Sequence, residues 1–73
     1  MNDKIFKILS EILEEPIDIN TTRNNSNNWD SINQIKIILM LQTEFSVSFS
    51  AQEISDIHSV QDIINIISQK TKM

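Results

Sequence analysis

Apolar residues recur at the spacing of an amphipathic helix in two stretches that lie near the ends of this chain. In the first stretch the apolar positions are Ile5, Ile8, Leu9, Ile12 and Leu13. Pro16 marks the end of this helix, because proline cannot continue the backbone hydrogen bonds. In the last stretch they are Val60, Ile63, Ile64 and Ile67, which form a single inward-facing stripe. Each stretch predicts one helix that covers a core.

A helix expected from about Ser31 to Phe45 has apolar residues on two faces. One face carries Ile37, Ile38, Leu41 and Phe45, and the nearly opposite face carries Ile32, Ile35 and Leu39. A small domain cannot easily bury both faces. Either the helix is central and is covered by its neighbours, or the second face is exposed and contacts a partner. We favour the second interpretation.

A capping box predicts one short helix, and the remaining apolar residues predict an extended connection. Ser50 and Glu53 have the spacing of a capping box, so a short helix is expected after Ser50, and Ser59 opens the last helix in a similar way. The alternating Phe45, Val47 and Phe49 are expected to close one end of a helical bundle rather than to form a strand. The predicted fold is therefore all-α, a small four-helix bundle with three longer helices and one short helix.

A long loop, from about Pro16 to Asp30, separates the first two helices. The sequence has no glycine, and asparagines cluster in this loop. Because asparagine tolerates positive φ better than most residues, we expect these asparagines to take the place of glycine. We also expect the loop to be the most mobile segment, with only Trp29 holding its end.

Length, charge and composition limit the classes of function. Residues 1–73 are expected to form a single domain with a thin core, as a monomer. The absence of cysteine excludes disulfides and thiolate chemistry. The net charge of −4 argues against nucleic acid and is compatible with basic protein partners. No signal-peptide pattern or membrane-spanning run is found, so we expect a cytoplasmic protein without stable membrane insertion.

Ser31 is the candidate functional residue, and the sequence around it allows two interpretations. It follows Asp30 at the start of the two-faced helix, beside the Ile32, Ile35 and Leu39 face. The run from Ser31 to Gln34 also fits a capping box, so Ser31 could serve only as a helix cap.

The stretch that runs from Trp29-Asp30-Ser31-Ile32 through Glu44 to Phe49, followed by Ile57 and Val60 to Ile64, resembles acyl carrier proteins over most of the chain. The resemblance implies that Ser31 receives 4'-phosphopantetheine from coenzyme A, with Asp30 and Ile32 as the neighbours of the attachment motif. The first turn of a helix favours the phosphodiester that would form there.

The resemblance further implies a carrier and not an enzyme, so no catalytic residues are expected. The arm would hold an acyl or aminoacyl group as a thioester. The partners would be a phosphopantetheinyl transferase and the enzymes that load or consume the acyl or aminoacyl group, which would contact Ile32, Ile35, Leu39 and Trp29. Trp29 has the alternative role of packing over the start of the helix.

Several positions depart from the carrier pattern. Asn33, Lys36, Gln42 and Thr43 stand where fatty-acid carriers have acids, and Asn28-Trp29 replaces the usual glycine before the Asp-Ser pair. These differences favour a specialised biosynthetic pathway over a housekeeping role.

Other readings of the sequence are weaker. His58, between Asp56 and Ser59, has neither a predicted cleft for catalysis nor enough neighbouring ligands for a metal. A helix-turn-helix that binds nucleic acid does not fit the charge. The alternative to a carrier is a small helical interaction adaptor in which Ser31 is only a cap.

Overall fold

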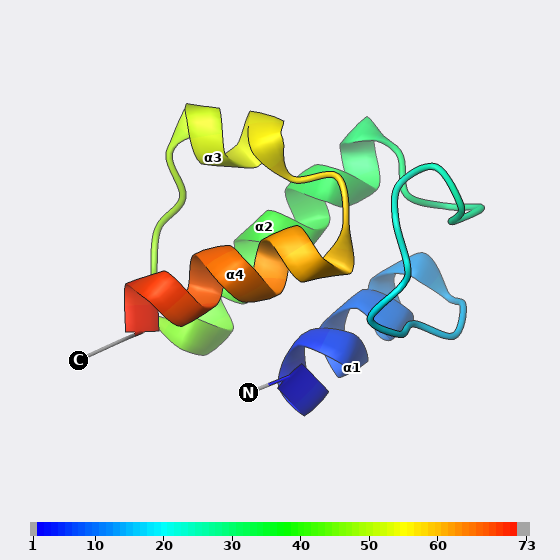
Figure 1. Cartoon of the computed structure of the whole chain (residues 1–73), viewed down its shortest axis with the longest axis horizontal. Coiled ribbons are helices and arrows are strands. Elements are labelled where there is room, and N and C mark those ends of the chain that lie inside the picture. The colour runs from blue at the N-terminus through cyan, green and yellow to red at the C-terminus, as the bar shows by residue number, and fades with distance from the viewer. Residues whose placement is uncertain (1, 72–73) are drawn as a thin grey trace.

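In the part of the chain that the structure describes, four helices form where the apolar pattern and the capping boxes predict them (Figure 1). The computed structural model describes residues 2–71. Helix α1 comprises Asn2–Leu13, α2 Ser31–Phe45, α3 Ala51–Asp56 and α4 Val60–Thr71. The described residues contain no strand and one isolated β-bridge, so the all-α class with three longer helices and one short helix is confirmed. Within the same range, no helix has the length and apolarity required to cross a bilayer.

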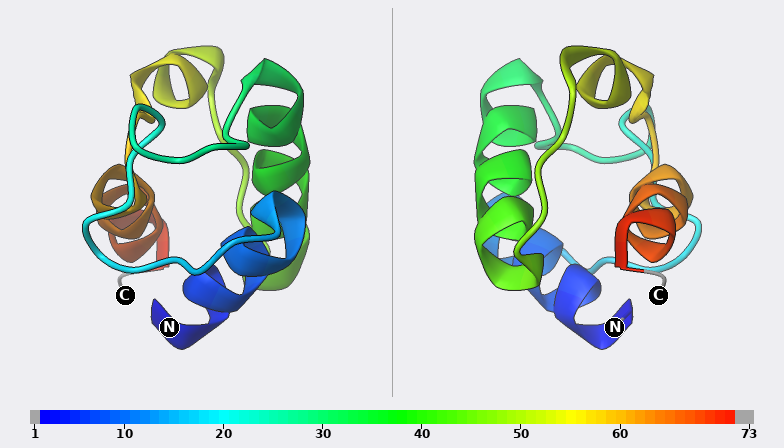
Figure 2. Two further views of the ribbon diagram at one scale, coloured as in Figure 1. Left: turned by 90° about the vertical axis from the view of Figure 1, so that its right-hand side faces the viewer. Right: turned by 90° about the vertical axis from the view of Figure 1, so that its left-hand side faces the viewer.

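The helices surround one apolar core. Figure 2 shows α1, α2 and α4 on three sides of the interior, with α3 across the fourth side between α2 and α4. The buried residues of α1, α2 and α4 supply most of the core, and α3 buries none of its own residues. The connections add Trp29, Phe49 and Ile57. Phe49 and the partly buried Val47 therefore close the bundle from an extended connection, as their alternation predicted.

Two helices end with left-handed residues that are not the expected asparagines. Among the described residues, positive φ occurs at Glu14, 55°, and at Ser46, 54°. The Glu14 amide donates to the Ser10 carbonyl at 2.9 Å, and the Ser46 amide donates to the Gln42 carbonyl. Both residues therefore satisfy the last carbonyls of a helix, the role that glycine usually fills. No asparagine within residues 2–71 has a positive φ, so the prediction that the loop asparagines take the place of glycine is wrong.

Side-chain hydrogen bonds hold the asparagine-rich loop. Thr22 and Asn25 bond each other's backbone amides at 2.8 and 3.1 Å. The Asn28 amide group donates to the Leu13 carbonyl at 2.7 Å, and Ser26 donates to the Glu15 carboxylate at 2.6 Å. The expectation that only Trp29 holds this loop is therefore wrong. The asparagines cap the end of α1 and brace the loop.

The loop is also joined to the connection between α3 and α4. An antiparallel bridge pairs Thr22 with Ser59. The Arg23 amide donates to the His58 carbonyl at 2.9 Å, and the Val60 amide donates to the Thr21 carbonyl at 3.0 Å. These bonds place residues 21–23 beside the start of α4.

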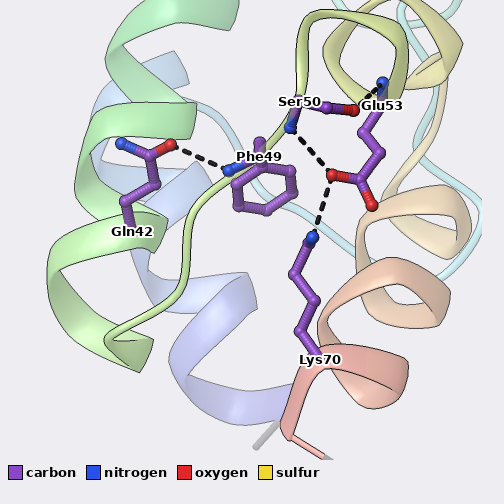
Figure 3. A network of polar contacts seen from close by, with 5 residues as sticks. All are labelled: Gln42, Phe49, Ser50, Glu53 and Lys70. Carbon is purple, nitrogen blue, oxygen red and sulfur yellow. Dashed lines mark hydrogen bonds and ion pairs between the residues drawn. The ribbon is translucent and has the colours of Figure 1, made fainter.

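A polar network ties α3 to the end of α4 (Figure 3). Ser50 and Glu53 form the predicted capping box, with bonds of 3.1 and 2.8 Å. Lys70 approaches the Glu53 carboxylate to 2.8 Å, and its ammonium lies 5.6 Å from the centre of the Phe49 ring. Because α3 buries no residue of its own, this network contributes to holding it over the core.

We predict that replacing Lys70 by glutamine raises the pKa of Glu53. The bond from Lys70, and then the backbone bond from Ser50, hold the pKa of the Glu53 carboxyl below its ordinary value of 4.5. A lowered folded-state pKa gives stability that is present above the unfolded pKa and is lost as the pH falls through the folded one. As the pH falls below about 4.5, the Lys70→Gln variant should therefore lose less stability than the unchanged chain.

An NMR titration of the Glu53 carboxyl measures this change directly. Lys4→Gln is the control. Lys4 pairs at 3.6 Å with Glu44 and not with Glu53, so its loss should leave the Glu53 titration unchanged. An unchanged Glu53 titration in the Lys70 variant would show that the contact does not form in solution.

Candidate functional site

Asp30, not Ser31, caps α2. Asp30 has extended backbone angles, and its Oδ1 accepts the Asn33 amide at 2.8 Å. Its carbonyl accepts the Gln34 amide at 2.8 Å. Ser31 is therefore the first residue inside the helix. The interpretation of Ser31 as the helix cap is wrong, because the preceding aspartate already supplies the capping oxygen.

The three serines at helix starts differ in what their hydroxyls do. The Ser50 hydroxyl accepts the Glu53 amide, and the Ser59 hydroxyl accepts the Asp62 amide, each at 3.1 Å. The Ser31 side chain makes no hydrogen bond within residues 2–71, and Ser31 is exposed. Ser31 alone of these serines presents a hydroxyl that can be modified without removing a cap.

The electrostatics of the first turn favour an added negative group on Ser31. The first amides of an α-helix have no helical acceptor and carry a partial positive charge. No acidic residue lies in the first turn of α2, and the Asp30 carboxylate is engaged with Asn33. A phosphodiester on the Ser31 oxygen would therefore lie close to unpaired N–H groups.

Beside Ser31, the outer face of α2 is apolar and exposed. We call Ile32, Ile35 and Leu39 the α2 stripe, and their exposed fractions are 69%, 51% and 57%. Met40, about 100° around the helix from Leu39, is also exposed, at 50%. The opposite face buries Ile37, Ile38 and Leu41. Of the two interpretations of this helix, the exposed one is confirmed and the fully covered one is wrong.

Trp29 lies in the core, at 5% exposure, and its indole N–H donates to the Gln34 side-chain oxygen at 2.6 Å. The prediction that Trp29 contacts partners does not hold for a side chain buried in this way. Packing over the start of α2, the alternative role, is the one that the structure shows. From its place in the core, Trp29 therefore holds the start of α2, where Asp30 and Ser31 lie.

Gln34 is a site residue that the sequence analysis missed. It is 4% exposed, and its side-chain nitrogen donates to the carbonyls of Ile54 and Ile57 at 3.1 and 3.4 Å. It thereby joins Trp29 and α2 to α3 and to the residue that follows α3. The available signal was its position, because Gln34 falls on the helix face of Ile37, Ile38 and Leu41.

The backbone of His58 has a structural role. Its backbone amide donates to the Asp62 carboxylate at 2.9 Å at the start of α4. Among the described residues, no group of three or more His, Cys, Asp or Glu is placed to hold a metal ion.

Comparison with known proteins places the chain in a family. No family model matches the sequence. No curated protein matches it either. The structure is similar to an acyl carrier protein from Thermotoga maritima, with a TM-score of 0.77 and 30% identity over 93% of this chain and 82% of that one. It is also similar in fold to a proposed acyl carrier protein from Mycobacterium tuberculosis, with a TM-score of 0.86 and 21% identity over 94% and 96% of the two chains.

The fold, and the 30% identity that runs through nearly the whole chain, define a carrier-protein domain rather than an enzyme. The chain belongs to the acyl carrier protein family.

Proposed function

We propose that Ser31 is the attachment residue for 4'-phosphopantetheine and that the arm carries an acyl or aminoacyl group as a thioester. The observation that supports this most strongly is the free Ser31 hydroxyl at the first helical position, behind a cap supplied by Asp30. The residues present fit the group, because the hydroxyl is exposed and the first turn of α2 offers N–H groups to a phosphodiester.

The attachment reaction requires no catalytic residue on this chain. The Ser31 oxygen forms a bond to the β-phosphorus of coenzyme A, and the bond from that phosphorus to the bridging oxygen breaks. Adenosine 3',5'-bisphosphate leaves with the electron pair, and the serine proton passes to a base on the transferase. The chain contributes an exposed nucleophile that Asp30, Asn33 and Trp29 hold in place.

The partners of the carrier would be the transferase and the enzymes that load and consume the carried group. They would contact the α2 stripe, which begins one residue after the arm. The first turn of α2 has no acid, and Glu44 near its end pairs with Lys4. The lack of an acid in the first turn, and the pairing of Glu44, support docking through apolar contacts. They also support a role in a dedicated, specialised biosynthetic pathway. We place this pathway in the cytoplasm.

Intact-mass measurement tests the proposed attachment. After incubation with coenzyme A and a broad-specificity phosphopantetheinyl transferase, the mass should rise by that of one arm. An unchanged mass with several transferases would overturn the proposal and favour the interaction adaptor.

Partner binding should depend less on salt than it does for a carrier whose second helix is strongly acidic. Salt screens exposed charges, whereas burial of the α2 stripe is not screened. Affinity for a loading enzyme should therefore fall less than about tenfold between low and high salt. Only a few surface ion pairs would be screened, and each contributes little to binding. Leu39→Ala should weaken the same binding.

Isothermal titration at two salt concentrations provides the measurement. Thr43→Ala, an exposed change on the same helix, is the matched control for Leu39→Ala. A steep loss of affinity with salt, or equal binding by the Leu39 and Thr43 variants, would contradict docking through the stripe.

A further inference from the structure

A polar pocket of about 390 Å³ opens close to the start of α2. Its lining residues are Arg23, Asn24, Trp29 and His58. They come from the braced loop and from the connection between α3 and α4, which the Arg23 to His58 backbone bond of 2.9 Å holds together. The pocket therefore has walls fixed by backbone pairing.

The side chains of this pocket are suited to an anion. The Arg23 guanidinium has no ion pair or hydrogen bond within residues 2–71. Asn24 offers an amide donor, and a neutral or charged histidine offers at least one ring N–H. No acidic residue lines the pocket, although the chain has ten acids and a net charge of −4. An unpaired guanidinium in such a setting binds carboxylates well, because its donors match both oxygens.

The position of the pocket links it to Ser31. Trp29 lines it, and Ser31 follows only two residues later, so their Cα atoms are at most about 7 Å apart. A phosphopantetheine arm is longer than this Cα separation, and Trp29 lines the pocket, so an arm on Ser31 is long enough to fold back toward the residues of the pocket. The volume falls within the range of small-molecule sites, about 300 to 1,000 Å³.

We infer that this pocket receives a carboxylate at the end of the carried group, and hence that the carrier takes acyl groups with a free acid. The inference rests on the proposed attachment at Ser31. Arg23 would pair with the carboxylate, Asn24 and His58 would donate to it, and the small exposed part of Trp29 would contact the adjoining carbon chain.

The test compares two cargoes that differ only at the end. The chain is loaded from succinyl-coenzyme A or butyryl-coenzyme A by a broad-specificity transferase, so a carboxylate replaces a terminal methyl. Loading is verified by intact mass, and NMR then follows the Arg23 Nε–H, the Trp29 indole N–H and the His58 amide. Succinyl should shift these signals and butyryl should not, and Arg23→Gln should remove the difference.

Lys7→Gln, an equal loss of charge on α1 outside this pocket, should keep the difference between the cargoes. The Arg23 variant should fold, because its backbone bond to His58 does not use the side chain. Equal shifts with both cargoes would show that the phosphodiester of the arm fills the pocket, and would overturn the inference, as would the absence of any shift. Failure to load would overturn the proposed function instead, and the inference with it.

Discussion

Leu41→Ala should lower the free energy of unfolding by about 2 to 5 kcal/mol, the range for deleting a fully buried leucine. Leu41 has no exposed surface and lies on the inner face of α2. The side chain cannot be truncated without leaving a cavity. Because a domain of this size has a thin core and small total stability, the variant should be close to unfolding at room temperature. Urea unfolding followed by circular dichroism measures the change.

Leu39→Ala is the matched control, the same deletion on the same helix. Leu39 is 57% exposed and belongs to the α2 stripe. Its loss should change stability by no more than about 0.5 kcal/mol, as is usual for surface positions. Equal destabilisation by the two substitutions would mean that the stripe is packed in solution and is not a docking surface.

Gln34→Ala should destabilise the fold by at least about 2 kcal/mol, because its loss leaves buried groups without partners. The Trp29 indole N–H would lose its acceptor, and the carbonyls of Ile54 and Ile57 would lose a donor. The variant should also loosen the start of α2, since Trp29 no longer has a fixed partner. Chemical unfolding gives the first effect, and amide exchange at Ser31 and Ile32 gives the second.

Gln61→Ala is the control for this change. Gln61 is exposed on α4, and within residues 2–71 its side chain bonds only Asn65, four residues along the same helix. Its substitution should be nearly neutral. A loss below about 1 kcal/mol for Gln34→Ala would show that water replaces the side chain, and that the polar contact does not fix the start of α2.

Hydrophobic spacing was enough to predict the three longer helices and the two faces of α2, and the short α3 was predicted from its capping box. The buried positions follow helical spacing closely, so α2 was expected from about Ser31 to Phe45 and runs over those residues. The exposure of Ile32, Ile35 and Leu39 followed from the same pattern, because a domain this small has too little interior to bury both faces.

Polar detail could not be predicted in the same way. Asp30 and Ser31 are both good caps, and their neighbours fit either choice, so only the backbone geometry shows that Asp30 is used. Some of the bonds that hold the loop join residues far apart in sequence, such as Asn28 and Leu13. Gln34 is polar on an apolar face, where spacing predicts burial but gives no information on the partners.

Tandem mass spectrometry of the modified chain tests the central claim most directly. After incubation with coenzyme A and a transferase, the arm should be found on Ser31 and on no other residue. Ser50→Ala and Ser59→Ala should be modified as fully as the unchanged chain, whereas Ser31→Ala should not be modified at all. An arm on Ser50 or Ser59, or undiminished modification of Ser31→Ala, would contradict the assignment of Ser31 as the attachment residue.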